Sequence, residues 1–275
     1  MKGMILLSKK ILTIQDISCY GQCSTTVALP ILSAYGIETA ILPSAILSTH
    51  TSGFKNFTVL DLTDEMPKII NHWKQENIKF DALYTGYIGD ERQFDLILEC
   101  KKNLLNKNAI FFVDPAMADH GKLYPALNEE IILGMKKISK LADYIIPNVT
   151  EAAFLTDTKY EEIYSEEFIN LLLYRLKELG AKKIFLTGVC KENKLGVIYY
   201  DGKNKIECYK DLIFPSYHGT GDIFSSLILS GILNNEPIDV LLDKSTQFIV
   251  ESIKNTLDDN THSYGVKFEE ILKKE

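Results

Sequence analysis

Short apolar runs alternate along the chain with longer stretches in which apolar and polar positions follow a helical spacing. The apolar runs are rich in β-branched and aromatic residues, which favour strands, and they cover residues 11–15, 38–42, 82–85, 109–113, 143–146 and 183–187. The helical stretches cover residues 25–35, 65–75, 92–104, 129–141 and 165–179, and a short helix is expected to open at Thr150 and Glu151. A strand followed by a helix, repeated in this way, is typical of βαβ units. The pattern therefore predicts an α/β protein with a mostly parallel sheet covered by helices on both faces.

The last third of the chain departs from this alternation. Residues 196–200 and 205–209 have strand character and flank a segment that contains Asp201-Gly202, which predicts a β-hairpin. Helical spacing then returns over residues 222–234 and 236–256. No linker, repeat or change of composition divides the sequence, so residues 1–275 are predicted to form a single domain.

Polar side chains gather where the predicted strands end. The clusters cover residues 16–24, 44–53, 86–87, 114–115, 148–151, 187–188 and 218–222. The C-terminal ends of parallel strands meet at one edge of the sheet, which is where open α/β sheets bind their ligands. The pattern therefore predicts an enzyme with its site at that edge.

The segment Gly219-Thr220-Gly221-Asp222 has the composition of an anion site at the start of a helix. Glycines allow backbone N–H groups to approach a ligand closely, and the first N–H groups of a helix have no partner within it. Together with the helix dipole, these groups suit a phosphate. A carboxylate repels phosphate, so Asp222 is predicted to accept a proton from a hydroxyl group that attacks the phosphate. The alternative is that Asp222 only caps its helix or occupies its first turn.

Several enzyme classes are disfavoured because their motifs do not occur in the sequence. The chain has no G-x-x-x-x-G-K-[ST] loop, no G-x-G-x-x-G after its first strand, no G-x-S-x-G elbow and no H-E-x-x-H pair. A P-loop kinase, a dinucleotide-binding dehydrogenase, an α/β-hydrolase and a zinc protease are therefore not expected.

Composition adds further exclusions. A formal net charge of −7 without a basic patch argues against a nucleic-acid partner. No apolar run approaches the roughly 18 residues of a transmembrane helix. The N-terminal run Met4–Leu7 is too short for the core of a signal peptide, so a cytoplasmic location without membrane contact is expected. The five cysteines are scattered, so neither a disulfide framework nor a metal site at Cys19 and Cys23 is expected.

Further short motifs follow one another along the chain. They are Ile14-Gln15, Tyr20-Gly21, Ser48-Thr49-His50-Thr51, Thr85-Gly86-Tyr87, Val113-Asp114-Pro115 and Pro147-Asn148-Val149-Thr150-Glu151. In this order, and with the glycine loop after them, they resemble the ribokinase-like superfamily and within it the pyridoxal kinase branch. The resemblance implies a ribokinase-like three-layer sandwich, ATP as co-substrate, Mg²⁺ and a homodimer. It leaves open whether a monovalent cation assists.

The resemblance also implies a role for each motif residue. Asp222 would be the catalytic base, and the backbone of Gly219, Thr220 and Gly221 would form the anion hole. The substrate would be bound by Asp16, His50, Thr51 and Tyr87, with Thr51 hydrogen-bonded to the phenolic oxygen of a pyridine ring and Tyr87 packed against that ring. The residues implied for ATP are Asp114, Tyr124, Asn148, Glu151, Thr187 and Gly221, and Asp114 and Glu151 would hold Mg²⁺ through water.

Ordinary structural roles remain open for several of these residues. Asn148 and Glu151 are both common at the start of a helix. Asp114 before a proline suits a turn after a strand. Tyr87 would also suit a sheet core, and His50 would suit a structural hydrogen bond.

The chain departs from the family at two positions. Asp16 stands where the family usually has a serine facing the pyridine nitrogen, and a carboxylate there favours a protonated ring nitrogen or an amino-bearing ring. Ile146 stands where relatives often have threonine, which removes one hydroxyl group near the nucleotide phosphates. The resemblance implies a kinase that phosphorylates the hydroxymethyl group of a vitamin B6 vitamer, namely pyridoxal, pyridoxine or pyridoxamine. A hydroxymethylpyrimidine kinase of the same fold and a non-catalytic ligand-binding relative are the alternatives.

Overall fold

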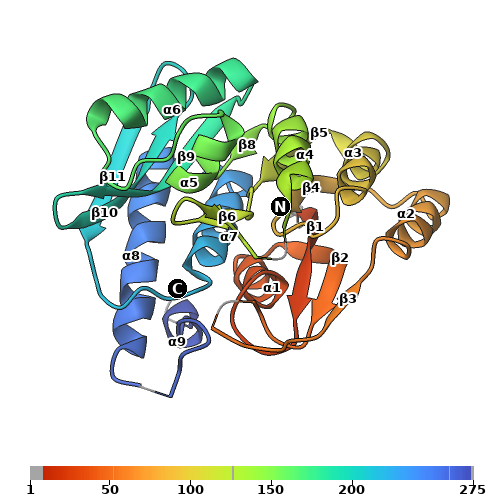
Figure 1. Cartoon of the computed structure of the whole chain (residues 1–275). Helices are drawn as coiled ribbons and strands as arrows, with labels where there is room; N and C mark the ends of the chain where they lie inside the picture. Colours follow the sequence, from red (N-terminus) through yellow and green to blue (C-terminus); the bar gives the residue numbers. More distant parts are fainter. Residues whose placement is uncertain (1–8, 52, 126, 260, 274–275) are drawn as a thin grey trace, which may run out of the picture.

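A nine-stranded sheet forms the centre of the computed structural model, which describes residues 9–51, 53–125, 127–259 and 261–273 (Figure 1). The order of strands across the sheet is β11-β10-β9-β8-β5-β4-β1-β2-β3. Their bounds are β1 (Lys10–Ser18), β2 (Glu38–Leu47), β3 (Val59–Asp61), β4 (Phe80–Thr85), β5 (Leu105–Val113), β8 (Tyr144–Ile145), β9 (Lys183–Lys191), β10 (Lys194–Tyr200) and β11 (Lys205–Asp211). A separate small hairpin pairs β6 (Ala118–Asp119) with β7 (Lys122–Leu123).

The middle of the sheet is parallel and its edges are antiparallel. Strands β2, β1, β4, β5, β8 and β9 run parallel, whereas β3 at one edge and β10 and β11 at the other are antiparallel to their neighbours. Successive side chains of a strand point to opposite faces. Leu12 and Ile14 therefore pack on one face and Ile11 on the other, and all three are fully buried. The predicted burial of both faces is confirmed.

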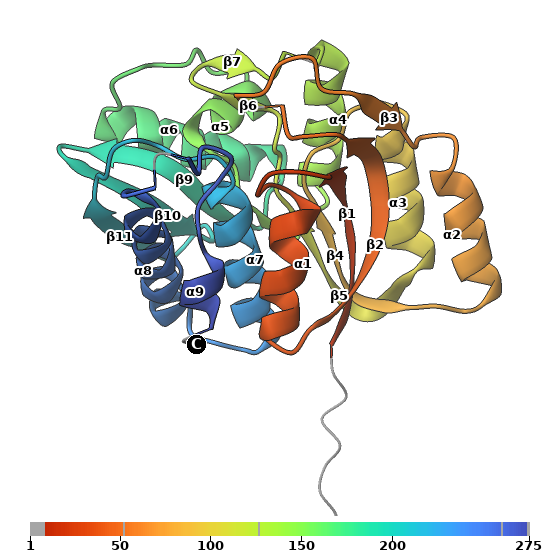
Figure 2. The same cartoon turned by 90° about the horizontal axis from the view of Figure 1, so that it is seen from below.

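Helices cover both faces of the sheet and complete three layers. Their bounds are α1 (Thr25–Ala34), α2 (Met66–Gln75), α3 (Gln93–Asn103), α4 (Glu129–Ser139), α5 (Val149–Leu155), α6 (Glu166–Leu179), α7 (Thr220–Leu233), α8 (Ile238–Thr256) and α9 (Glu269–Leu272). Helices α2 to α6 pack on the face that carries Leu12 and Ile14. Helices α1, α7 and α8 pack on the opposite face and lie side by side in Figure 2.

Local sequence explains where several helices begin and end. The Ser165 side chain accepts a hydrogen bond from Phe168 N and starts α6, and Gly180, with φ of 111°, ends it. The Asn128 side chain starts α4 in the same way, by accepting from Ile131 N. None of the described helices combines the length and the apolar character that a bilayer crossing requires.

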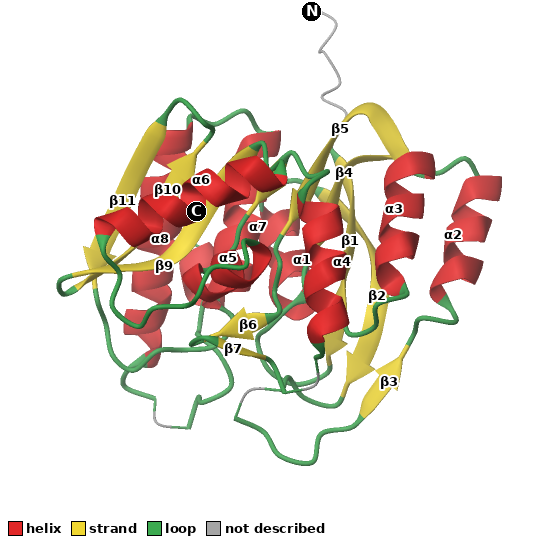
Figure 3. Cartoon of the chain, turned by 45° about the horizontal axis from the view of Figure 1, so that its top comes forward, coloured by secondary structure: helices red, strands yellow, loops and turns green. Residues whose placement is uncertain are grey.

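The predicted elements are all present, which confirms the α/β class, but their lengths differ. Strands β1 and β2 extend beyond the apolar runs, to Ser18 and Leu47, because backbone pairing continues after the hydrophobic pattern ends. Strand β3 and the β6–β7 hairpin (Figure 3) and helix α9 (Figure 2) were not predicted. Each strand or helix among them has only two to four residues, which is too short to show a periodicity. The run Met4–Leu7 lies outside the described residues.

Candidate active site

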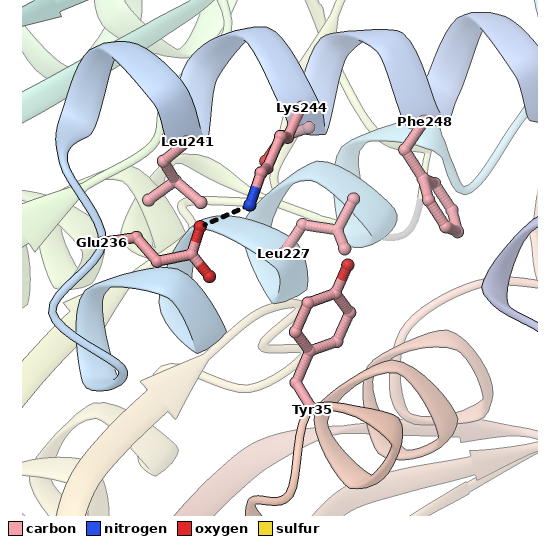
Figure 4. A pocket seen from close by; sticks show the side chains of 7 residues that line it. Tyr35, Leu227, Glu236, Leu241, Lys244 and Phe248 are labelled. Carbon is pink, nitrogen blue, oxygen red and sulfur yellow. Dashed lines mark hydrogen bonds and ion pairs between the residues drawn. The ribbon is translucent and has the colours of Figure 1, made fainter. Parts of the chain in front are cut away.

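A small cavity between α1, α7 and α8 is too small to be the site. It has a volume of about 10 Å³ and is lined by Leu227, Leu241 and Phe248, with an ion pair of 3.3 Å between Lys244 Nζ and Glu236 Oε2 (Figure 4). This is room for about one water molecule. No organic substrate fits there.

A far larger cavity, of about 590 Å³, opens at the C-terminal ends of the parallel strands, and we call it the strand-end cavity. The side chains or backbone of every residue that the sequence nominated line it: Asp16, His50, Thr51, Tyr87, Asp114, Tyr124, Asn148, Glu151, Thr187, Gly219, Thr220, Gly221 and Asp222. The structure therefore brings the nominated residues together at the edge of the sheet at which the sequence predicted the site.

The strand-end cavity has two ends with different chemistry. The β1 end is polar and follows β1, β2 and β4, with Asp16, Ser18, His50, Thr51 and Tyr87 in its wall. The β11 end is largely apolar and lies between β10, the segment after β11, and α8, with Val197, Leu212, Thr246, Ile249 and Ile253 in its wall. Helix α7 packs against α1 and against α8, so its start, which also lines the cavity, lies between these ends.

Two glycines shape the start of α7 for different reasons. Gly219 is the N-cap residue and has φ of 82°, and a Cβ atom there would overlap the carbonyl oxygen of Gln22. A Cβ atom at Gly221 would meet nothing within 4 Å, so the space over this residue is open to the cavity. The first N–H groups of α7 face a space that a ligand can enter, as an anion site requires.

Asp222 is the third residue of α7, and its carboxylate faces away from its own helix. Its Oδ2 accepts a hydrogen bond of 2.9 Å from the backbone N–H of Ser24, in the loop before α1. Burial, and then the nearby Asp114 carboxylate, raise the pKa of Asp222 to about 7, against the lowering effect of the Ser24 bond. The N-cap is Gly219, so the interpretation of Asp222 as a capping residue is wrong, whereas its expected place in the first turn of the helix is confirmed.

Asp114 follows β5 and connects to the same helix. It is 8% exposed, and its Oδ2 accepts a hydrogen bond of 2.6 Å from the Ser225 hydroxyl on α7. Burial raises the pKa of Asp114 to about 6, although the Ser225 bond opposes the shift. Ser225 lies one turn of α7 after Asp222, so this bond holds the buried Asp114 carboxyl group near Asp222.

Asn148 and Glu151 form a complete capping box at the start of α5. Asn148 Oδ1 accepts from Glu151 N at 2.9 Å, and Glu151 Oε2 accepts from Asn148 N at 2.8 Å. Glu151 Oε1 also accepts from Met117 N at 3.1 Å, and burial and the Asp114 charge raise the pKa of Glu151 well above its ordinary value. The helix-start interpretation is therefore correct, and the same two side chains also line the strand-end cavity.

The strand-end cavity carries an excess of acidic groups. Its lining residues include Asp16, Asp114, Asp119, Glu151, Asp211 and Asp222, and among the described lining residues Lys210 is the one Lys or Arg. Oxygen donors of this kind suit Mg²⁺, which commonly takes one or two carboxylates and completes its shell with water and substrate phosphates. In the described part of the chain, no group of three or more His, Cys, Asp or Glu side chains is arranged to hold a metal by itself. The donor set therefore fits a Mg²⁺ ion that arrives with phosphates.

The β1 end is held in place by the C-terminal segment. His50 Nε2 lies 3.2 Å from the Tyr264 carbonyl oxygen, and its ring packs 4.9 Å from that of Phe54. Gln22 N donates to the same Tyr264 carbonyl at 2.9 Å. Burial lowers the pKa of His50. The structural role considered for His50 is therefore present, while one side of its ring still lines the cavity.

Three serines contribute to the site and were not nominated from the sequence. Ser18 donates to Asp16 at 2.9 Å, Ser24 donates through its backbone to Asp222, and Ser225 donates to Asp114. The last two contacts join residues 198 and 111 positions apart. Serine is common in loops and helices, so no sequence pattern identifies these three. The contributions of Ser24 and Ser225 follow only from the contacts of α7 with the loop before α1 and with Asp114 after β5, whereas Ser18 lies two residues from Asp16.

Comparisons with known proteins identify the family of the chain. The profile of the phosphomethylpyrimidine kinase family matches residues 29–267. The chain is 31% identical over 265 residues to the pyridoxal kinase of Arabidopsis thaliana, in an alignment that covers 91% of this chain and 83% of that protein.

Two crystal structures have nearly the same fold. The pyridoxal kinase of Lactobacillus plantarum matches with a TM-score of 0.89 and 27% identity, over 97% of this chain and 96% of that one. A Bacteroides thetaiotaomicron protein crystallised with pyridoxal, and provisionally assigned as a phosphomethylpyrimidine kinase, matches with a TM-score of 0.93 and 34% identity, over 98% and 96% of the two chains. This chain therefore belongs to the phosphomethylpyrimidine kinase family and, within the ribokinase-like fold, to its pyridoxal kinase branch.

Proposed function

We propose that the protein transfers the γ-phosphoryl group of ATP to the hydroxymethyl group of a vitamin B6 vitamer. The observation that carries this proposal is the Asp222 carboxylate at the start of α7, beside the open space over Gly221 and between the two ends of the cavity. The similarity to named pyridoxal kinases, and to a relative crystallised with pyridoxal, supports the choice of substrate.

The two ends of the cavity divide the two substrates between them. The polar β1 end takes the pyridine ring, with Thr51 as a hydrogen-bonding partner and Tyr87 as a flat wall. The apolar β11 end takes the adenine base of ATP. This leaves the phosphates near Asn148, Thr187 and Tyr124, and the γ-phosphate over the start of α7.

The chemical step needs a base and an anion site. Asp222 accepts the hydroxymethyl proton as the oxygen attacks the γ-phosphorus. A new O–P bond forms, the bond from the γ-phosphorus to the β-phosphate oxygen breaks, and ADP leaves. Backbone N–H groups of Gly219, Thr220 and Gly221 hold the charge on the transferred phosphoryl group. A carboxylate whose pKa is raised to about 7 binds a proton well and can still be ionised near neutral pH.

Asp114 and Glu151 are the residues proposed to hold Mg²⁺, through water. When bound, Mg²⁺ neutralises phosphate charge and orients the phosphates for transfer. Without such a cation, the acidic lining of the cavity would repel ATP, because Lys210 alone cannot offset six carboxyl groups.

The proposal is tested by measuring ADP release with Mg²⁺-ATP and a panel of alcohols. The panel contains pyridoxal, pyridoxine, pyridoxamine, hydroxymethylpyrimidine, ribose and adenosine, and Asp222→Asn serves as the control for contaminating kinases. Turnover on a B6 vitamer well above the other compounds is expected. Turnover on the pyrimidine alone would keep the base and the anion site and replace the substrate. No turnover on any compound would favour a ligand-binding relative.

The proposal also includes a homodimer, which rests on the family resemblance, and a cytoplasmic location, which rests on the apolar runs of the sequence. Light scattering of the purified protein would then give twice the mass of the 31.1 kDa chain. A mass of one chain at micromolar concentration would contradict the dimer.

A further inference from the structure

Ser24, whose backbone N–H donates to the proposed base Asp222, has a strained backbone. Its φ is 52° and its ψ is −129°. Residues other than glycine seldom have a positive φ, and this pair of angles lies outside the left-handed helical region as well. Such a conformation persists only where the surrounding structure holds it, and it often occurs at functional sites. The bond of 2.9 Å from Ser24 N to Asp222 Oδ2 therefore depends on the contacts that hold this loop.

The loop that carries Ser24, residues 19–24 between β1 and α1, is bonded through Gln22 to the C-terminal part of the chain. Gln22 N donates to the Tyr264 carbonyl oxygen at 2.9 Å, and Gln22 Nε2 donates to Glu269 Oε1 at 2.5 Å. His262 Nε2 lies 3.0 Å from Gln22 Oε1, and His262 is 8% exposed. These partners come from residues 262–269, which we call the C-terminal clamp. One residue of the β1–α1 loop thus makes three hydrogen bonds to the clamp.

Two glycines leave room for Gln22 between the C-terminal clamp and the start of α7. A Cβ atom at Gly265 in the clamp would lie 2.5 Å from Gln22 Cβ. A Cβ atom at Gly219, the N-cap of α7, would lie 2.0 Å from the Gln22 carbonyl oxygen. Contacts this close leave no space for a larger residue at either glycine. Gln22 is therefore enclosed from both sides, two positions before the strained Ser24.

Capping of α1 does not account for the backbone of Ser24. Ser24 and Ser165 are both serines at the N-cap position of a helix. Ser165 has the extended backbone that is usual for a cap, with φ of −79° and ψ of 160°, and its side chain accepts from Phe168 N. Ser24 makes no side-chain cap bond to α1, all of whose residues the structure describes. Its conformation forgoes the ordinary benefit of a serine cap and directs the Ser24 N–H to Asp222.

We propose that Gln22 is a positioning residue, through which the C-terminal clamp holds Ser24 in its strained conformation and so keeps Asp222 in place. This inference rests on the proposed function for the role of Asp222. The Ser24 N–H fixes Oδ2 of the carboxylate, and Oδ1 is left to accept the hydroxymethyl proton. An error of about 1 Å in the place of a reacting group can cost about 10²-fold in rate, so the hold on this loop acts on kcat.

The first measurement is hydrogen–deuterium exchange of residues 19–24, which reports on the loop without turnover. Gln22→Ala removes both side-chain bonds to the clamp, and Glu269→Ala removes one of them. Gln247→Ala is the matched control, because Gln247 Nε2 donates to Glu251 Oε1 at 3.1 Å on α8, outside the lining of the cavity. Exchange should be about tenfold faster in Gln22→Ala, faster to a smaller extent in Glu269→Ala, and unchanged in Gln247→Ala.

The second measurement is a pair of double-mutant cycles, which show whether the effect of Gln22 passes through the backbone of Ser24. Gln22→Ala is made in the Ser24→Gly and in the Ser24→Ala background. Both substitutions remove the hydroxyl group and keep the N–H, but only glycine adopts a φ of 52° without strain. Gln22→Ala should lower kcat about tenfold in the wild-type and Ser24→Ala backgrounds, and by less than about threefold in the Ser24→Gly background.

Two outcomes would overturn the proposal. One is an equal loss of kcat in the two Ser24 backgrounds, which is the result of a merely structural role for Gln22. The other is a Gln22→Ala protein whose loop exchanges at the wild-type rate. If circular dichroism shows that Gln22→Ala fails to fold, Glu269→Ala takes its place in both backgrounds. Failure of the proposed function looks different, because the wild-type protein would then release no ADP with any alcohol, while exchange in Gln22→Ala would still be faster.

Discussion

Helices α5 and α7 both carry an acidic side chain at their third position, yet the two side chains are used in opposite ways. Glu151 in α5 completes a capping box with Asn148 and accepts a further bond from Met117 N. Asp222 in α7 follows a glycine cap that has no side chain, and it accepts a bond from Ser24, which lies outside its helix. Both oxygens of the Glu151 carboxylate accept backbone hydrogen bonds, which suits it to act on a cation through water, whereas the bond from Ser24 engages Oδ2 of Asp222 at the start of the open space over α7. The cap residue, asparagine in one helix and glycine in the other, decides between the two outcomes.

The largest effect is expected from Asp222→Asn. The amide keeps the size of the side chain and cannot accept the substrate proton, so kcat should fall by at least about 10²-fold with little change in the KM of the alcohol. Steady-state kinetics with the best vitamer measure both constants. Glu151→Gln is the matched variant on α5, and it should raise the Mg²⁺ concentration needed for half-maximal rate while lowering kcat less than Asp222→Asn does. Equal losses of kcat in the two variants would break the contrast between the helices.

The pH profile should show the same contrast. Asp222 acts as a base only when ionised, and its pKa is raised to about 7. The rate constant kcat/KM should therefore fall as pH decreases through about 7, by about tenfold per unit well below that value. Profiles measured from pH 5 to pH 9 on the wild-type protein give the midpoint. The low residual activity of Asp222→Asn should not show this fall of kcat/KM at low pH. If the fall persists in the variant, a group other than Asp222 is the one that titrates.

The two glycines of α7 allow the anion site to be tested separately from the fold. Gly221→Ala places a methyl group in the open space over the helix, so kcat/KM for ATP should fall about tenfold. Stability should be unchanged or higher by up to about 1 kcal/mol, because alanine is the better helix former. Gly219→Ala should instead destabilise the protein, since the residue has φ of 82° and the methyl group would overlap Gln22. Thermal unfolding and ATP kinetics on both variants are needed. A stable, fully active Gly221→Ala protein would place the phosphate elsewhere.

The contrast between α5 and α7 also marks how far the sequence alone can lead. The sequence predicts the fold from the alternation of strands and helices. It predicts the site from the glycine loop and from the polar side chains where strands end, and the structure brings these residues to one cavity. They do not show whether an acidic residue in a first turn faces its own helix or the cavity. That depends on the contact between Asp222 and Ser24, which are 198 positions apart. The hydrogen bond between Ser225 and Asp114, which are 111 positions apart, cannot be predicted from the sequence for the same reason.

The smallest expected effect concerns the cap of α5. Asn148→Ala removes the side chain that accepts from Glu151 N at 2.9 Å, which should lower the free energy of unfolding by about 1 kcal/mol. Ser165→Ala removes the corresponding cap of α6, outside the lining of the cavity, and should lower stability by a similar amount. The two variants should differ in activity. Loss of the Asn148 side chain removes its bonds to Glu151 N and to the Ala118 carbonyl oxygen beside the cavity, so the KM for ATP should rise several-fold, whereas Ser165→Ala should leave it unchanged. Denaturant unfolding and ATP kinetics, measured together, compare them. If both variants keep the wild-type KM, the capping box stabilises α5 and has no part in ATP binding. Glu151 and Asp222 would then differ in function even more than their hydrogen bonds indicate.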